Sequence, residues 1–181
     1  MIATLTELRE ALRADFRRNG GGGPRLTLTI FRVGQYCHAN TSLAASLLKP
    51  LWRAADVVYL RTLLHCEMPA AFNCGPGLSL PHAGRGVVVH HNATLGANSM
   101  LYHRVTLGAQ GGRAPRLAND VTIGAGACVL GPIHVGERAR IGANAVVVTD
   151  VGAGETAVGV PARVRSTEAQ ERGTEGFVGN A

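Results

Sequence analysis

Residues 117–147, LANDVTIGAGACVLGPIHVGERARIGANAVV, repeat with a period of six. An aliphatic residue opens every hexad, and a glycine often follows it. The same period extends back to Val89, with one excess of four residues before Leu117. All ten positions that open a hexad are aliphatic: Val89, Leu95, Leu101, Leu107, Leu117, Ile123, Val129, Val135, Ile141 and Val147. This period is neither the 3.6 of a helix nor the 2 of an ordinary strand, and it is typical of a parallel β-helix.

A second column of side chains supports the same fold. Four residues after nine of the ten positions lies a small or β-branched residue, and the tenth, Gly111, falls inside the interrupting stretch GAQGGRAPR, residues 108–116. A β-sandwich of short strands is the alternative. Ten aliphatic matches with a single break in register favour the β-helix, with each hexad forming one side of a coil.

Composition sets limits on the core and on the partners. The chain has 181 residues, of which 46% are apolar but only 4% aromatic, so its core must be aliphatic. The formal net charge is +6, and 17 of the 18 basic residues are arginine, which makes anionic partners plausible. The arginines are spread along the chain with little aromatic interleaving, so a phosphorylated small molecule is favoured over nucleic acid.

The cysteines and the N-terminal residues predict a reduced, cytoplasmic protein. No two of the four cysteines form a CxxC pair, and the first residues, MIATLTELREALRADF, carry acidic charges where a signal peptide would begin with basic ones. No uncharged apolar stretch approaches the roughly 20 residues that a membrane helix needs.

The first third of the chain predicts helices. Residues 3–18 place apolar side chains at helical spacing and stop at NGGGGP, residues 19–24, where we expect a flexible turn. Residues 24–65 predict further helix with a break at Lys49–Pro50. We therefore divide the chain into a helical region, 1–66, a β-helix domain, 67–165, and a polar, mobile tail, 166–181.

Residues 67–165 resemble the serine O-acetyltransferases and the related acetyltransferases of exopolysaccharide synthesis. The resemblance rests on the motifs LPHAGRGVVVH (residues 80–90), VTLGAQGG (105–112) and GVPARV (159–164), together with residues 114–147. Upstream, LRADFRRN (12–19) is similar to the helical lead-in of the shorter members. The resemblance implies a left-handed parallel β-helix, a homotrimer that can pair into a dimer of trimers, and acetyl-CoA as co-substrate.

The resemblance also implies a catalytic histidine at His82. Acetyl transfer to an alcohol needs a base that titrates near neutrality, which suits histidine. Glu67, which falls where the family has an aspartate, is the candidate for orienting that base, although a solvated glutamate is the alternative. His103 lies about one coil beyond His82 and is a candidate for substrate binding or, equally, a surface residue.

Coenzyme A carries phosphates and a long amide-bearing arm, and the resemblance implies residues for both. Gly108, Ala125 and Ala143 are expected to line the arm, because small side chains allow close approach. Arg140 and Arg163 are expected to meet the phosphates.

The acceptor side departs from the family pattern. Pro81 stands where serine acetyltransferases have an aspartate, and Ala114 replaces the histidine of an arginine-histidine pair. Arg113 is retained and is expected to bind an acceptor carboxylate. We expect L-serine as the acceptor, with a sugar or specialised-metabolite hydroxyl as the alternative.

Two functions of other classes stay open. A metal-dependent lyase of the γ-carbonic-anhydrase type would use the same fold, but the H-x4-H spacing expected for it is missing. His90 and His91 are expected to point to opposite faces of a strand and so not to share a metal, and no metal is expected elsewhere. A β-helix scaffold without catalysis is the third possibility.

Overall fold

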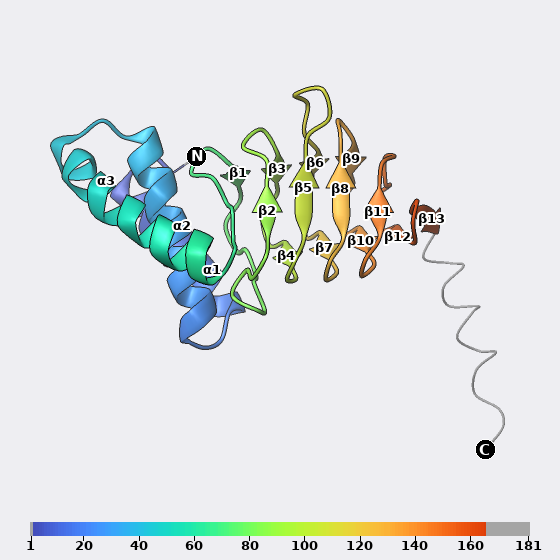
Figure 1. Ribbon diagram of the computed structural model, residues 1–181, viewed down its shortest axis with the longest axis horizontal. Helices are drawn as coiled ribbons and strands as arrows, with labels where there is room; N and C mark the ends of the chain where they lie inside the picture. The colour runs from blue at the N-terminus through green and yellow to red at the C-terminus, as the bar shows by residue number, and fades with distance from the viewer. Residues whose placement is uncertain (1, 166–181) are drawn as a thin grey trace, which may run out of the picture.

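The computed structural model describes residues 2–165, so the predicted polar tail, 166–181, lies outside the described residues. A helical segment stands at one end of a stack of short strands (Figure 1). This arrangement matches the predicted change of pattern between the helical region and the β-helix.

Three α-helices and a π-helix form the helical segment: α1 (Leu5–Arg18), α2 (Gly22–Ala39), α3 (Leu43–Ala55) and η1 (Asp56–Leu63). The helix predicted for residues 3–18 is confirmed. Thr4 begins it with a capping box, in which its side chain accepts from the Glu7 backbone N–H while the Glu7 carboxylate accepts from the N–H of Thr4.

The predicted break at Lys49–Pro50 is wrong, because Pro50 lies inside α3. The chain breaks earlier, between α2 and α3, where the Asn40 side chain accepts from the Ser42 N–H at 2.8 Å and the Ser42 hydroxyl accepts from the Ala45 N–H at 3.3 Å. These short polar side chains start a new helix at Leu43. The expected turn at residues 19–24 is shortened, since α2 begins within the glycine run.

Thirteen strands follow within residues 2–165, and all but the last belong to parallel ladders. One sheet holds β2 (Val88–Val89), β5 (Thr106–Gly108), β8 (Cys128–Leu130) and β11 (Val146–Val147). The second holds β1 (Asn73–Cys74), β3 (Thr94–Leu95), β6 (Arg116–Leu117) and β9 (His134–Val135). The third holds β4 (Met100–Leu101), β7 (Thr122–Ile123), β10 (Arg140–Ile141), β12 (Thr156–Val158) and the antiparallel β13 (Arg163–Arg165).

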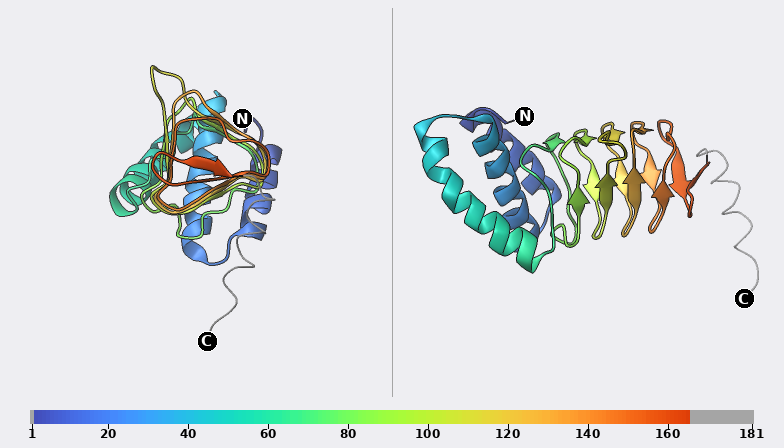
Figure 2. Two further views of the ribbon diagram at one scale, coloured as in Figure 1. Left: turned by 90° about the vertical axis from the view of Figure 1, so that its right-hand side faces the viewer. Right: turned by 45° about the horizontal axis from the view of Figure 1, so that its top comes forward.

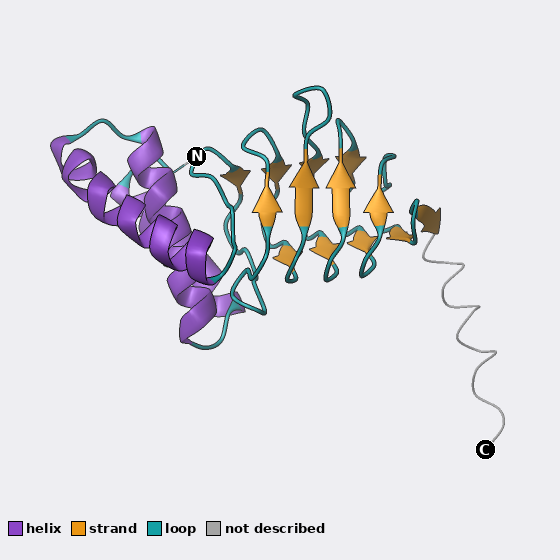
Figure 3. Cartoon of the chain, viewed as in Figure 1, coloured by secondary structure: helices purple, strands orange, loops and turns teal. Residues whose placement is uncertain are grey.

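The three sheets form the sides of a prism, and the parallel β-helix predicted from the hexads is confirmed. Successive coils lie over one another when the prism is viewed along its length (Figure 2), and short loops join the strands (Figure 3). The register repeats between neighbouring coils, as where Leu107 lies between Val89 and Val129.

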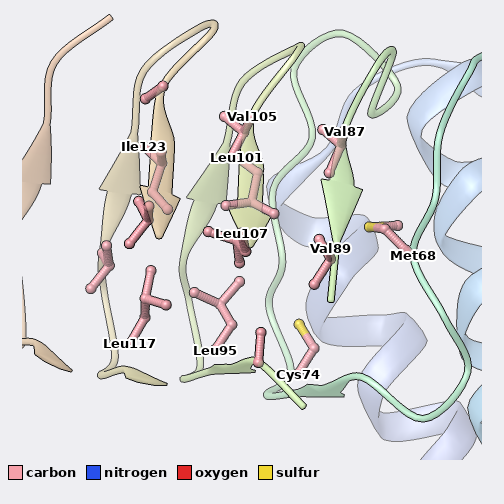
Figure 4. Close-up of a cluster of buried hydrophobic side chains, with 14 of the residues drawn as sticks. Met68, Cys74, Val87, Val89, Leu95, Leu101, Val105, Leu107, Leu117 and Ile123 are labelled. Carbon is pink, nitrogen blue, oxygen red and sulfur yellow. The ribbon is translucent and has the colours of Figure 1, made fainter. Parts of the chain in front are cut away.

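The hexad positions fill the interior of the prism. All ten aliphatic positions are buried, and so are the nine small or β-branched residues that follow them. Figure 4 shows Leu95, Leu101, Leu107 and Ile123 stacked between the sheets. The helices close one end of this core, where the Phe31 ring packs against Phe72 with centroids 6.0 Å apart.

The outer side of the last helices is apolar. Leu43, Leu47, Leu51 and Val58 are exposed and fall at spacings of a helical stripe along α3 and η1. None of the helices in the described part of the chain is long and apolar enough to cross a membrane.

Candidate active site

The prism has three edges, and the predicted site residues lie mainly on two of them. We call the turns at residues 81–87, 102–105, 124–127 and 142–145 the His82 edge. We call the turns at residues 90–93, 109–115, 131–133 and 148–150 the Arg113 edge. Strand β5 connects the two, since it leaves the first edge at Val105 and reaches the second at Gly108.

On the His82 edge, two predicted residues meet. The rings of His82 and His103 lie edge to face with centroids 4.7 Å apart and planes at 86°. Both rings line a cleft of about 620 Å³, whose walls are Leu63, Leu64, His65, His82, Arg85, Gly86, His103 and Arg104. The cleft therefore offers imidazole and guanidinium groups beside an apolar wall from the end of η1.

His82 occupies a turn inserted into the coil. Backbone bonds from Ala83 N–H to the Leu80 carbonyl (2.9 Å) and from Arg85 N–H to the His82 carbonyl (3.2 Å) close it. Ala83 has φ 57°, a conformation that a side chain disfavours, and Gly84 follows at 74°. The turn leaves the His82 side chain exposed.

One ring nitrogen of His103 is buried without a partner. Nδ1 of His103 forms no hydrogen bond with any other described residue. Buried polar atoms are usually paired, so this nitrogen is an exception.

Glu67 is not placed to orient His82. It lies exposed in a bridge beside Val88 on the flat β2 sheet, and it makes no hydrogen bond with His82. The hydrogen bond to Asp56 is the main cause that raises the pKa of Arg61, and burial is the main cause that raises the pKa of Cys66. The Glu67 charge adds a smaller increase to each. Within one copy of the chain, the predicted dyad is therefore not assembled.

The cysteine nearest the cleft is unreactive. Burial, followed by the charges of Asp56 and Glu67, raises the pKa of the Cys66 thiol to about 12. A thiol protonated at neutral pH is a poor nucleophile, so Cys66 serves packing rather than chemistry.

Two of the predicted coenzyme A residues continue the His82 edge. Backbone bonds link the turns in order, from Gly126 N–H to the His103 carbonyl (2.9 Å) and from Asn144 N–H to the Ala125 carbonyl (2.8 Å). Ala143 stands next to Asn144 one coil beyond Ala125. The edge above His103 therefore presents small side chains along which an extended arm can lie.

The other coenzyme A candidates lie around that edge. Arg163 pairs with Val158, whose side chain covers Gly142, so it stands at the far end of the row of small residues. Arg140 is exposed at the start of β10 on the adjoining flat sheet. Gly108 lies at the opposite end of β5, beside the Arg113 edge.

Arg113 lies on the other edge with two histidines that sequence reasoning set aside. Its loop is closed by mutual backbone bonds with Gln110 (2.9 and 3.2 Å). The Asn92 amide donates to the Gly112 carbonyl at 3.4 Å, which links this loop to the turn holding His90 and His91.

The expectation that His90 and His91 point to opposite faces is wrong. Their rings stack with centroids 4.2 Å apart and planes at 29°, because β2 ends at Val89 and both residues lie in the following turn. His90 Nδ1 accepts from the Asn92 N–H at 3.2 Å. The sequence carried one signal that these histidines lie in a turn: the position one coil after His91 is Ala109, which falls inside the interrupting stretch 108–116.

A second cleft lies on this edge. It measures about 610 Å³ and is lined by Asn92, Gly112, Arg113, Ala114, Arg116, Pro132 and His134. In one copy, the predicted site is thus divided, with His82, His103 and the small-residue row on one edge and Arg113 on another. Within residues 2–165, no three histidine, cysteine or acidic side chains gather in an arrangement that could hold a metal ion.

Comparison with known proteins begins with the repeats. Residues 114–149 match the family model described as bacterial transferase hexapeptide (six repeats). The serine acetyltransferase of Mycobacterium tuberculosis is 37% identical over 167 residues, which cover 88% of this chain and 72% of that protein. This chain belongs to the serine acetyltransferase family. The serine acetyltransferase of Synechococcus elongatus is 44% identical over 108 residues, but the match spans 58% of this chain and only 44% of that protein.

Solved structures agree with this membership. A soybean serine acetyltransferase complexed with serine superposes with a TM-score of 0.71 at 33% identity, covering 87% of this chain and 69% of that one. A serine acetyltransferase in complex with CoA has a TM-score of 0.73 at 27% identity, covering 89% and 71%.

Proposed function

We propose that the chain is an acetyl-CoA-dependent O-acetyltransferase that acts on L-serine. The observation that carries the proposal is the His82 edge, where the His82–His103 pair stands at the foot of a row of small residues that ends at Arg163. The family members solved with serine and with CoA support the same pair of substrates.

Acetyl transfer to a hydroxyl requires one base and the stabilisation of one anion. An imidazole takes the proton of the acceptor hydroxyl as its oxygen attacks the thioester carbonyl. The tetrahedral oxyanion is held by backbone N–H groups, and it collapses by breaking the carbon–sulfur bond. The departing thiolate takes up a proton, so the products are the O-acetyl ester and free CoA.

Each predicted residue has a task in this scheme. His82 is the base, and His103 beside it binds the acceptor. Gly108, Ala125 and Ala143 line the pantetheine arm, and Arg140 and Arg163 meet the phosphates. Arg113 binds the acceptor carboxylate by a charge-assisted bond. Glu67 keeps its proposed orienting role only if assembly changes its surroundings.

We further propose that a homotrimer completes the site. A cyclic assembly places a different surface of each copy against the next, and in the ring that we propose the Arg113 edge of one copy meets the His82 edge of its neighbour. Such a ring unites Arg113 with His82 from two copies. Light scattering on the purified protein is expected to give a trimer or a pair of trimers, and a monomer that retains activity would contradict this arrangement.

The Arg113 edge supplies the competing base. His91 lies on the same edge as Arg113, so a site built from one copy favours His91, whereas a site built across two copies admits His82. The two assignments make opposite predictions for single variants. Loss of activity in His91→Ala with full activity in His82→Ala would move the base to the Arg113 edge.

The experiment measures free thiol released from acetyl-CoA with serine, homoserine and a panel of sugars. We expect release with serine and a loss of about 10²- to 10⁴-fold in kcat for His82→Ala. Preference for a sugar would correct the acceptor. Bound zinc with no transfer would favour the metal-dependent lyase, and no turnover with any acceptor would favour the scaffold.

Mixed trimers test whether two copies share a site. His82→Ala and Arg113→Ala chains, each inactive alone, are co-expressed with different tags and purified through both. Every trimer that carries both tags has one restored site among its three interfaces, so about one third of the sites regain activity. The matched control mixes His91→Ala chains with Arg113→Ala chains. No chain in that mixture has both His91 and Arg113, so a site built from these two residues of one copy is not restored.

A further inference from the structure

A cavity lies between α2 and α3, which pack side by side in the helical segment (Figure 1). It measures about 300 Å³ and is lined by Cys37, His38, Lys49, Trp52 and Arg53. None of these residues lines the clefts of the His82 edge and the Arg113 edge. The cavity therefore lies outside the residues assigned to acetyl transfer, and the proposed function gives it no role.

The walls of this cavity carry cations without a counter-charge. Lys49 and Arg53 lie one turn apart on α3, and His38 comes from the last turn of α2. No carboxylate is among the described residues that line the cavity. Within residues 2–165 the structure has two ion pairs, and neither involves a residue of this cavity. Because like charges four residues apart on a helix repel each other, an anion bound between them would relieve a real cost.

The inner wall of the cavity is tightly packed. The Trp52 indole lies against Gly34 of α2, where an added Cβ would stand 2.6 Å from its Nε1. The glycine thus allows α3 to approach α2 closely. Cys37 is 0% exposed and belongs to a small apolar cluster with Tyr36 and Ala45. These contacts hold the indole and the two helices in place, so the cavity exists before any ligand binds.

The Lys49 ammonium acts on that inner wall. Burial raises the pKa of the Cys37 thiol, and the positive charge of Lys49 opposes this increase. The charge of Lys49 therefore reaches into the cavity and is not directed only toward solvent.

We propose that this cavity binds a small oxyanion of the phosphate class through Lys49, Arg53 and His38. A guanidinium offers a planar fork of donors that matches two phosphate oxygens, and an ammonium adds a compact charge with three donors. A volume of about 300 Å³ is at the lower end of the range for small-molecule sites. It leaves room for the phosphate of a small ester as well as for free phosphate, with the Trp52 ring as the wall beside it.

Trp52 makes binding directly observable, because it is the single tryptophan of the sequence. Inorganic phosphate is titrated into the full-length protein at constant ionic strength, with chloride as the compensating salt. We expect a saturable change in tryptophan emission that chloride alone does not produce, since screening depends on ionic strength and not on the kind of anion. Phosphate is also expected to raise the melting temperature, because a ligand that binds only the folded chain stabilises it.

A second titration, with glycerol 3-phosphate, distinguishes the two sources of the oxyanion. Tighter binding than that of inorganic phosphate would identify an ester as the ligand, and weaker binding would identify the free anion. Either result supports the site.

Four variants locate the bound anion. Arg53→Gln and Lys49→Gln each remove one cation and keep a residue that favours helix. Each is expected to raise the Kd for phosphate at least about 10-fold, as for one lost charge-assisted hydrogen bond. Arg13→Gln removes the same charge from an exposed position of α1 and is the matched control, with wild-type affinity expected. Arg163→Gln is expected to keep the emission change, because phosphate at the coenzyme A residues lies outside this cavity.

The outcomes decide the proposal. Wild-type affinity in folded Arg53→Gln and Lys49→Gln would overturn it, because the anion would then lie elsewhere. An equal effect of chloride, or no change in both emission and melting temperature, would overturn it as well. A rise in melting temperature that the cavity variants lose supports the site even if the emission stays constant. If one of these two variants does not fold, the other decides.

Failure of this inference and failure of the proposed function are separate results. Acetylation of serine by a protein that does not bind phosphate in this cavity would overturn the inference and leave the function standing. Phosphate binding that depends on Arg53, in a protein that transfers no acetyl group, would do the reverse.

Discussion

His82 and His103 lie edge to face across two neighbouring coils, with ring centroids 4.7 Å apart. The contact joins the inserted turn to the first regular turn of the same edge. The Tyr102 ring lies farther from the proposed base, with its centroid 6.2 Å from that of His82.

Replacement of His103 is expected to affect acceptor binding. In His103→Phe, the ring and its packing remain but both nitrogens are lost, so the KM for serine is expected to rise about 10-fold, as for one lost hydrogen bond. The KM for acetyl-CoA is expected not to change. Tyr102→Phe, which alters the other ring near His82, is the control. A loss confined to kcat would instead assign His103 to the chemical step.

A large side chain at Ala143 is expected to block the donor. Ala143 is exposed in the small-residue row, so Ala143→Leu is expected to fold normally and to raise the KM for acetyl-CoA at least about 10-fold by occluding the arm. Ala153→Leu places the same side chain at an exposed turn on the third edge of the prism. Equal kinetic effects of the two substitutions would contradict a donor path along the His82 edge.

The buried ion pair is expected to be far more important for stability than the exposed one. Asp15→Asn leaves the Arg32 guanidinium buried without its counter-charge and is expected to lower the free energy of unfolding by about 3–5 kcal/mol. Asp56→Asn removes the half-exposed pair with Arg61 and is expected to lower it by about 1 kcal/mol or less. Urea unfolding of both variants measures the difference. Similar losses would show that the buried pair does not contribute more to stability than the exposed one.

Alkaline pH is expected to destabilise the protein through Cys66. The folded thiol has a pKa of about 12, raised by burial from its ordinary value of 9.0. Between these values the unfolded chain loses a proton that the folded chain keeps, so stability falls as pH rises. Relative to Cys66→Ala, the wild type is expected to lose about 2 kcal/mol between pH 8 and pH 10.5. Parallel unfolding curves at both pH values test this, and a constant difference between the two proteins would contradict it.

Sequence reasoning was most successful where one period controls the structure. The hexads predicted which side chains are buried, because a coil of fixed length returns every aliphatic residue to the interior. The prediction at Pro50 failed, since capping by Asn40 and Ser42 decides where α3 begins and a proline in the helix is tolerated.

The candidate site was harder to predict because it depends on turns, which lie outside the period. The spacing placed His103 near His82, but it could not show that Glu67 lies exposed beside Val88 or that His90 and His91 stack. The Thr27 hydroxyl donates to the Ala83 carbonyl, and the Asn19 side chain accepts from the Leu80 N–H. These bonds join segments far apart in the chain, and no local pattern marks them.

The last described strand gives the stack of coils an end. Parallel strands whose N–H and carbonyl groups face outward invite another chain to add on, and a prism of identical coils would offer such a template at its tip. Here β13 turns back against β12, and Ala162 donates to the Val146 carbonyl at 2.8 Å on the neighbouring side. The helices cover the first coil and this reversal covers the last described one. The repeating fold is therefore protected from pairing with further chains into a fibre.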